Sequence, residues 1–396
     1  MFPATTDLPA SKSISHRTLI INALCEDGGT IENLSDCDDT VVLARALQCE
    51  SGTIDVEASG TALRFLTAYL ATKNGSFTLT GSPRLLQRPI APLVDALRTL
   101  GADIQYLEND GFAPLAINGK KLHGGELTPH FEQSSQFFSA LMLIAPYLDT
   151  ALTLHFAETP HSFPYIEMTA AMMRQAGAKI TIDSNKISIE NTPYQRTNWT
   201  IERDWSAASY WYELLAIAQR GRLLLRHLQP STLQGDAHIA TIFQEFGIET
   251  NFITDGAEIF YKDKTAPTTL RYDFCNMLDM VPTMTVTCCA RGVTFHFTGV
   301  ENLRLKESDR IGALSAELKK CGFVLTQPTS DSLAWDGTRC PAEPAPTICT
   351  HDDHRIAMAF APLAAKMPLH IDHPKVASKS YPSFFEQMRR FLIPLS

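Results

Sequence analysis

The feature that most constrains the fold of this chain is a segment pattern that recurs six times. In each copy, a small or polar cluster is followed directly by about ten mostly apolar residues at helical spacing. If one residue of each copy is taken as an anchor, the intervals are 48, 75, 72, 73 and 74 residues. The anchors are Ser11, Ser59, Ser134, Ser206, Asp279 and Asp353. Solenoid repeats run about 20–50 residues, so this longer spacing instead predicts a unit of several strands and two helices, used six times.

The segments between the anchors alternate between strand and helix patterns. Strands are predicted over residues 75–81, 151–158, 179–190, 221–229 and 292–300. A helix that ends at a glycine and leads into a strand is predicted over residues 94–104, 167–180, 240–250 and 313–325. This alternation predicts an α/β or α+β fold with layered sheets. A chain of 396 residues favours two domains, and three copies in each would place the boundary near residues 200–204.

Composition and charge exclude several classes of protein. Apolar residues make up 44% and charged residues 19%, which indicates a folded chain with a sizeable core. The net charge of −9 argues against nucleic acid and anionic membranes as partners. None of the nine cysteines forms a Cys-x-x-Cys pair, and neither a signal segment nor an apolar run of about 20 residues is present. We therefore expect a soluble, cytoplasmic protein with reduced thiols.

Basic and hydroxyl side chains gather at several predicted helix starts. Lys12, Ser13 and Arg17 surround the first start, and Gly60 and Arg64 the second. Free backbone N–H groups and the helix dipole favour an anion at such a place. The alternative for each is helix capping with solvated charges. Together, the copies predict several helix starts directed at one anionic ligand.

Other segments carry groups that would suit a charged substrate. Arg88 lies in a loop rich in proline and arginine, and Ser134, Ser135 and Gln136 precede a nearly apolar helix. Glu307 lies among cations, where it would serve either in an exposed ion pair or as a general acid or base.

Two more segments leave their role open. Residues 351–355 read His-Asp-Asp-His-Arg, which could form a metal site, although Arg355 would repel a divalent cation. Lys379, in a polar segment near the C-terminus, does not by itself indicate a function. The motifs of P-loop kinases, dinucleotide-binding oxidoreductases, zincins and α/β-hydrolases are absent.

Nine ordered motifs resemble those of the 5-enolpyruvylshikimate-3-phosphate synthase family, from about Leu8 to Phe385. They read LPASKSISHR, SGTALR, RP within LLQRPI, SSQ, HSFPY, LDMVPT, NLRLKESDR, DDHRIAMAF and SKSYP. The resemblance implies two similar α/β domains, each of three βαβαββ units arranged as an inside-out α/β barrel and joined by two crossovers. The implied domains are residues 13–203 and residues 1–12 with 204–396.

The resemblance also implies a reaction and its residues. The enolpyruvyl group of phosphoenolpyruvate would pass to the 5-hydroxyl of shikimate 3-phosphate, with release of phosphate and with no metal or organic cofactor. Shikimate 3-phosphate would be held by Lys12, Ser13, Arg17, Ser134, Ser135, Gln136, Ser162, Tyr165, Asp279, Asn302 and Lys306. Phosphoenolpyruvate would be held by Lys12, Gly60, Arg88, Gln136, Arg310, Arg355 and Lys379. The implied catalytic groups are Asp279, as base toward the hydroxyl, and Glu307, Lys12 and Lys379.

The chain departs from the family pattern at three places. The segment ahead of residue 8 is about ten residues shorter than is usual in the family, Ala58 and Ser59 replace a usual Asn-Ala, and His16 replaces a common Asn.

Three other functions are alternatives to this one. The first is the related UDP-N-acetylglucosamine enolpyruvyl transferase, whose usual cysteine is missing from residues 81–88. The others are a non-catalytic metabolite sensor and a metal-dependent hydrolase. We expect a monomer that acts on small molecules.

Overall fold

A computed structural model describes residues 4–129 and 134–392, and its chain divides into two compact units. One unit is Ser11–Ile201, and the other combines Met1–Ala10 with Glu202–Ser396. The division expected from the sequence starts two residues later at each crossover. The observed division starts earlier because the first helix already begins at Lys12 and because Arg203 donates a hydrogen bond to the carbonyl of Leu8.

The unit Ser11–Ile201 contains two complete βαβαββ repeats and a third that is split along the chain. The first repeat comprises β3 (Gly52–Asp55), α3 (Gly60–Thr72), β4 (Gly75–Thr80), α4 (Ala91–Thr99), β5 (Asp103–Tyr106) and β6 (Leu115–Gly119). The second comprises β7 (Gly125–Leu127), α5 (Ser135–Ile144), β8 (Leu152–His155), α6 (Phe163–Gln175), β9 (Ile180–Ile182) and β10 (Lys186–Ile189). Their sheets have matching orders, β3-β4-β6-β5 and β7-β8-β10-β9. The split repeat contains α1 (Lys12–Leu24), β2 (Ile31–Glu32), α2 (Asp38–Leu47) and β11 (Trp199–Thr200).

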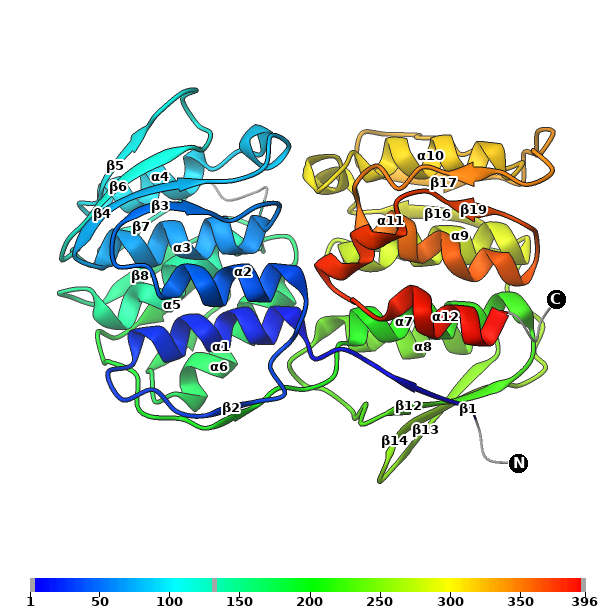
Figure 1. The fold of residues 1–396 in the computed structure, drawn as a ribbon, viewed down its shortest axis with the longest axis horizontal. Helices are drawn as coiled ribbons and strands as arrows, with labels where there is room; N and C mark the ends of the chain where they lie inside the picture. The colour runs from blue at the N-terminus through cyan, green and yellow to red at the C-terminus, as the bar shows by residue number, and fades with distance from the viewer. Residues whose placement is uncertain (1–3, 130–133, 393–396) are drawn as a thin grey trace. The chain divides into compact units, whose positions relative to one another are not determined.

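The other unit follows the same plan, with all six elements in its first repeat and fewer strands among the described residues of the second and third. Its first repeat comprises β1 (Ala4–Asp7), α7 (Trp205–Ala218), β12 (Arg222–Arg226), α8 (Ile239–Gln244), β13 (Ile248–Ile253) and β14 (Gly256–Tyr261), with sheet order β1-β12-β14-β13. Its second comprises β15 (Thr269–Asp273), α9 (Val281–Arg291), β16 (Thr294–Thr298), α10 (Arg310–Lys320) and β17 (Ser332–Trp335). Its third comprises β18 (Thr347–Ile348), α11 (His354–Phe360), β19 (His370–Ile371) and α12 (Phe384–Leu392). In Figure 1 the blue strand β1 lies beside the green strand β12, and from there the colours run to red at α12.

Short 3-10 helices join the regular elements in both units. They are η1 (Leu85–Gln87), η2 (Ala145–Tyr147), η3 (Gly235–His238), η4 (Leu278–Met280), η5 (Glu301–Leu305), η6 (Ala361–Ala365) and η7 (Pro374–Lys379). No helix among the described ranges is both long enough and apolar enough to cross a bilayer.

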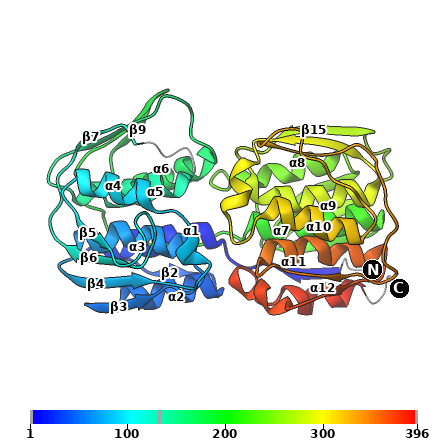
Figure 2. The same ribbon diagram turned by 90° about the horizontal axis from the view of Figure 1, so that it is seen from above.

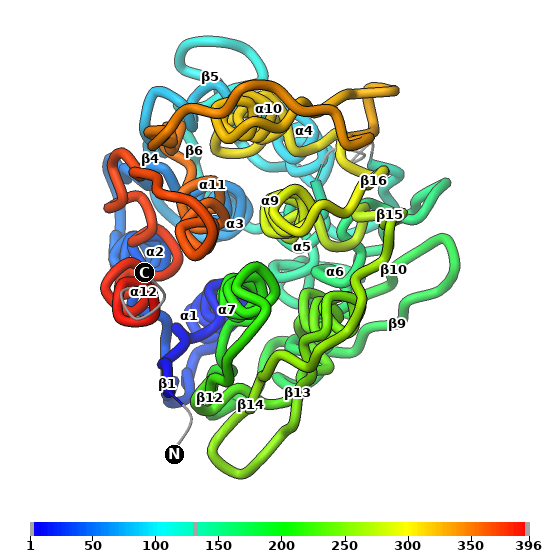
Figure 3. Tube along the Cα trace, turned by 90° about the vertical axis from the view of Figure 1, so that its right-hand side faces the viewer, coloured from blue at the N-terminus to red at the C-terminus, as the bar shows by residue number. Residues whose placement is uncertain are grey.

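The six anchors of the sequence each lie at the start of a core helix. Four of them, the three serines 11, 59 and 134 and Asp353, are the N-caps of α1, α3, α5 and α11. For α7 the cap is Asp204, two residues ahead of the anchor, while Asp279 lies in η4 directly before α9. In the unit with the C-terminus, α7 and α9 lie inside and the strands β12–β16 outside (Figure 3). The predicted α/β class with repeated βαβαββ units is confirmed.

One predicted strand is not formed as expected. The segment after α10 contains only isolated bridges, Phe323 with Arg339 and Thr326 with Ala334. After Thr326 the chain continues with Gln327 and Pro328, and a proline has no backbone N–H to donate to a neighbouring strand. The prediction of a strand at the end of residues 313–325 was therefore wrong. The glycine ahead of it is as expected, since Gly322 has a φ of +90° after the last turn of α10.

Candidate active site

A buried arginine on α1 links three helices of the unit Ser11–Ile201. Its Nε donates to Oγ1 of Thr169 at 2.7 Å, and its Nη2 donates to Oγ of Ser139 and the carbonyl of Tyr165, both at 3.1 Å. Nη1 donates to the carbonyl of Ser13 at 2.9 Å. Complete burial lowers the pKa of this residue, Arg17, to about 10. These four partners are all uncharged, so the site favours an anionic ligand that would complete the charge balance.

A second group of cations lies at the first turn of α3. Nη1 of Arg64 donates to the carbonyl of Gly60 at 3.0 Å and to Oε1 of Gln136 at 3.2 Å. A methyl group added at Gly60 would lie 2.5 Å from Nη1 of Arg88 and 2.7 Å from Nη1 of Arg64. The structure thus brings Gly60, Arg88 and Gln136 together, as three of the residues implied by the resemblance. Arg64 belongs to the same group, as the sequence pattern at this helix start indicated, although the resemblance gave it no substrate contact. Its position four residues after Gly60 puts both on one helix face.

The other candidates of this unit also lie at helix starts. Nζ of Lys12, at the first residue of α1, is 3.1 Å from Oδ2 of Asp39. Ser134 caps α5, because its Oγ accepts from the backbone N–H of Gln136. Ser135 is the first residue of α5. Two further candidates are at the start of α6, where Ser162 is the N-cap and Tyr165 lies in the first turn.

A network of arginines and carboxylates is the main feature of the other unit. Arg310, the first residue of α10, is 1% exposed and contacts three carboxylates. Its Nη1 is 2.9 Å from Oδ1 of Asp279, its Nη2 is 2.8 Å from Oε2 of Glu307, and its Nε is 2.8 Å from Oδ2 of Asp353. Arg355 binds the other oxygen of Asp279 at 2.6 Å. Residues separated by up to 76 positions in the chain thus form one ion-pair network.

The charges of this network control the ionisation of Asp279. Burial alone would raise the pKa of this carboxyl group, but Arg355, Arg310 and Lys306 outweigh burial and hold the pKa well below its ordinary value. For Arg310, burial alone would lower the pKa, and the carboxylates of Asp353, Glu307 and Asp279 instead hold it above the ordinary value. The carboxylate of Asp279 is therefore ionised and pairs with both arginines, one through each oxygen.

Two buried aspartates of this unit, Asp353 and Asp236, are absent from the site residues that the resemblance implied, although Asp353 is an anchor of the repeated pattern. Asp353 caps α11, and its oxygens also accept from Arg310 and from Oγ of Ser308. Asp236 in η3 accepts a hydrogen bond from the hydroxyl of Ser206. Burial, followed by the nearby charge of Asp279, raises the pKa of Asp236 to about 6. The density of charged residues at 351–355 was a sequence signal for Asp353, whereas no motif marked Asp236.

The remaining candidates lie near this network. Asn302 belongs to η5 and is 7% exposed, and the charge of Lys306 acts on Asp279. Lys379 is the last residue of η7, is 7% exposed, and belongs to an element that packs against α11. Within the described residues, no group of three or more His, Cys, Asp and Glu side chains is arranged to hold a metal ion. At 351–355, the Asp353 carboxylate is instead directed to arginine and serine.

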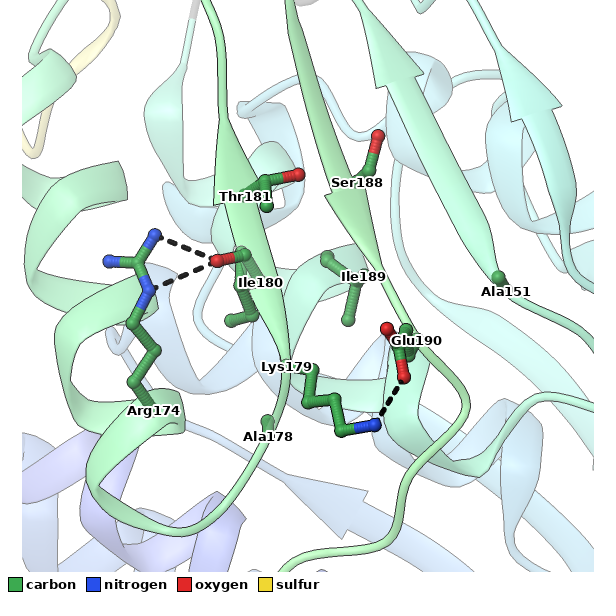
Figure 4. A pocket seen from close by; sticks show the side chains of 9 residues that line it. All are labelled: Ala151, Arg174, Ala178, Lys179, Ile180, Thr181, Ser188, Ile189 and Glu190. Atoms are coloured by element: carbon green, nitrogen blue, oxygen red, sulfur yellow. Dashed lines mark hydrogen bonds and ion pairs between the residues drawn. The ribbon is translucent and has the colours of Figure 1, made fainter.

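Pockets also occur outside these clusters. One of about 380 Å³ lies against β9 and β10, where Arg174 donates to the carbonyl of Ile180 and Lys179 pairs with Glu190 (Figure 4). A second, of about 430 Å³, lies beside the C-terminal end of α9 and includes Arg291. Neither is lined by a residue that the sequence analysis singled out, so the candidate site rests on the two side-chain clusters.

Comparison with known proteins identifies the family. A family model described as EPSP synthase (3-phosphoshikimate 1-carboxyvinyltransferase) matches residues 45–388. A 3-phosphoshikimate 1-carboxyvinyltransferase of Bacteroides fragilis (strain YCH46) is 44% identical over 389 residues, which cover 98% of this chain and 95% of the relative. One of Syntrophobacter fumaroxidans is 36% identical, with 98% and 96% covered.

Solved structures support the same fold. An EPSP synthase from Acinetobacter baumannii superposes with a TM-score of 0.77 at 23% identity, covering 98% of this chain and 95% of that one. The enolpyruvyl transferase NikO from Streptomyces tendae gives 0.70 at 15% identity, covering 98% and 94%. At these identities the superpositions show the fold, while the family model and the sequence relatives show the family. The chain belongs to the EPSP synthase (3-phosphoshikimate 1-carboxyvinyltransferase) family.

Proposed function

We propose that this chain transfers the enolpyruvyl group of phosphoenolpyruvate to the 5-hydroxyl of shikimate 3-phosphate and releases phosphate. Family membership carries the proposal, since relatives with 44% and 36% identity over nearly the whole chain bear the name of this activity. The side-chain clusters fit two multiply charged anionic substrates. This reaction belongs to the route to chorismate and the aromatic amino acids.

The cluster around Arg17 would hold shikimate 3-phosphate. A cation that is buried among neutral partners gains most from an anion, because solvent does not screen the interaction. The hydroxyls of α5 and α6 would then bind the ring oxygens and the phosphate. The whole proposed set is Lys12, Ser13, Arg17, Ser134, Ser135, Gln136, Ser162, Tyr165, Asp279, Asn302 and Lys306.

The arginines paired with Asp279 would hold phosphoenolpyruvate. Arg310 and Arg355 present guanidinium groups whose geometry suits carboxylate and phosphate. In the ligand-free chain Asp279 takes the place of such an anion. When the substrate's anionic groups bind these arginines, Asp279 loses part of its compensation, so its pKa rises and it becomes a stronger base. The whole proposed set is Lys12, Gly60, Arg88, Gln136, Arg310, Arg355 and Lys379.

The proposed chemistry needs one base and one acid. Asp279 would take the proton of the 5-hydroxyl while that oxygen bonds to C2 of phosphoenolpyruvate, and Glu307 or a lysine, Lys12 or Lys379, would give a proton to C3. In the second half, the bond from C2 to the phosphate oxygen breaks and C3 returns a proton. Fixed cations around the reacting carbon would stabilise the charges that develop. No metal or organic cofactor takes part.

The test is phosphate release from shikimate 3-phosphate and phosphoenolpyruvate with a chelator present. We expect turnover with both substrates, none when UDP-N-acetylglucosamine replaces shikimate 3-phosphate, and no loss on chelation. A folded protein that releases no phosphate would overturn the proposal. Activity that disappears with the chelator would favour a metal-dependent enzyme instead.

We further propose that the chain acts in the cytoplasm as a monomer. The nine cysteines are free thiols rather than disulfides, which suits a reducing compartment. The mass of the chain is 43.8 kDa, so light scattering of the purified protein should return that value. Twice that mass would contradict the monomer.

A further inference from the structure

The segment that carries Arg355 begins with an unusual backbone. His351 and Asp352, directly ahead of the cap of α11, have φ values of 52° and 53°. Two consecutive residues with side chains in the left-handed region are strained, and such a conformation persists only when the surroundings hold it. The next residue, Asp353, caps α11 and binds Arg310. Whatever holds the strained pair therefore also sets where Asp353 and Arg355 lie.

Glu317 of α10 is the side chain that holds this turn. It is 2% exposed. Its Oε2 accepts from the backbone N–H of Cys349 at 2.9 Å, and its Oε1 lies 3.0 Å from Nε2 of His351, where the imidazole donates. Lys320 donates to Oε2 at 2.6 Å. A buried carboxylate with this set of donors is fully engaged, and both of its oxygens point into the turn.

Helix α10 contacts the same segment at two places. Arg310, its first residue, binds Asp353, and Glu317 lies seven residues later, which is about two turns along the same helix face. The contacts are at the two ends of the turn, at Cys349 and at Asp353. Helices α10 and α11 lie side by side (Figure 2). The turn is thus clamped between two residues of one helix.

We propose that Glu317 is a positioning residue for phosphoenolpyruvate binding. It acts through the turn 349–353, which sets the place of Arg355 and of the Asp353 carboxylate that orients Arg310. This inference rests on the proposed function, because phosphoenolpyruvate is the ligand assigned to both arginines. Glu317 itself does not touch the substrate.

The test compares steady-state constants of Glu317→Ala, Glu317→Gln and the wild type. Glu317→Ala removes the acceptor for Cys349 and His351, so we expect the KM for phosphoenolpyruvate to rise at least tenfold and the KM for shikimate 3-phosphate to stay within twofold. Glu317→Gln keeps an amide oxygen that can accept from the Cys349 N–H, so its KM for phosphoenolpyruvate should stay within about threefold. His351→Ala, which removes one contact only, should fall between them and serves if Glu317→Ala does not fold.

A matched control breaks another ion pair of the same unit. Glu258 on β14 pairs with Arg222 at 3.2 Å, and Glu258→Ala should leave both KM values unchanged. A merely structural Glu317 would lower the melting temperature of its variants while the two KM values stay equal to the wild type or rise together, and either result overturns the inference. If the wild type releases no phosphate, the proposed function fails as well. If it does and Glu317→Ala keeps its KM, only this inference fails.

Discussion

At the scale of single residues, Asp279 has two tasks that compete in the ligand-free chain. It pairs with Arg310 and Arg355, and this keeps its pKa too low for an effective base. Substrate anions that take over the arginines would remove this obstacle. Binding of phosphoenolpyruvate, the substrate assigned to both arginines, would therefore activate the base, and proton transfer from shikimate 3-phosphate would be slow until phosphoenolpyruvate is bound.

Replacement of Asp279 tests that role. A general base contributes about 100-fold to 10,000-fold to a rate, so Asp279→Ala should lower kcat by about 100-fold or more. The affinity for shikimate 3-phosphate, measured by calorimetry, should change little, since most of its proposed contacts lie elsewhere. A variant with wild-type turnover would show that another group accepts the proton.

Asp236 gives the pH dependence of stability a definite sign. The pKa of this carboxyl group is about 6 in the folded chain against an ordinary 3.8. The folded state thus binds the proton more tightly than the unfolded state, and stability falls as the pH rises from about 4 to about 6. A shift of about two units corresponds to at most about 3 kcal/mol. Asp236→Asn should therefore unfold at higher denaturant concentration than the wild type near pH 7 and at the same concentration near pH 4.

A control separates this effect from general charge removal. Asp263 is an exposed aspartate of the same unit. Asp263→Asn should unfold at the same denaturant concentration as the wild type at both pH values. If the wild type and Asp236→Asn unfold at the same denaturant concentration near pH 7, the surroundings of Asp236 do not destabilise its ionised form.

At the scale of elements, the start of α3 depends on the lack of a side chain at one position. A Cβ at Gly60 would meet the guanidinium groups of Arg88 and Arg64 at less than 3 Å, so these flexible ends would have to move. Gly60→Ala should raise the KM for phosphoenolpyruvate about tenfold, which is a loss of about 1.4 kcal/mol. The melting temperature should stay near that of the wild type, because alanine favours a helix. An unchanged KM would mean that Arg88 does not contact this substrate.

At the scale of the whole molecule, the sequence predicted the repeated helix starts but not the contacts between residues that are far apart in the chain. The spacing of the anchors predicted where α1, α3, α5 and α11 start, because capping residues and apolar periodicity are local signals. The contact of Arg310 with Asp353 spans 43 positions, and the influence of Asp279 on Asp236 also spans 43. Such contacts depend on how helices pack, for which a single sequence carries no local signal.

The net charge of the molecule and the charge of its clusters predict opposite effects of added salt on the binding of anionic substrates. The net charge of −9 repels anionic substrates over long distances, whereas cations such as Arg17 and Arg88 act over a few ångströms. At an ionic strength of about 0.1 M the screening length is about 10 Å, so the long-range repulsion is already weak and the close attraction remains. We expect the KM for shikimate 3-phosphate to rise several-fold between about 0.05 and 0.5 M potassium chloride.

A variant of the binding cluster checks that the salt effect is local. In Arg17→Gln the KM should start higher and should depend less on salt, because one of the screened cations is gone. A KM that falls as salt is added would mean that the repulsion by the whole molecule governs substrate capture. Since buried cations are screened less than exposed ones, the size of the slope also reports how far the phosphate is removed from solvent when it binds.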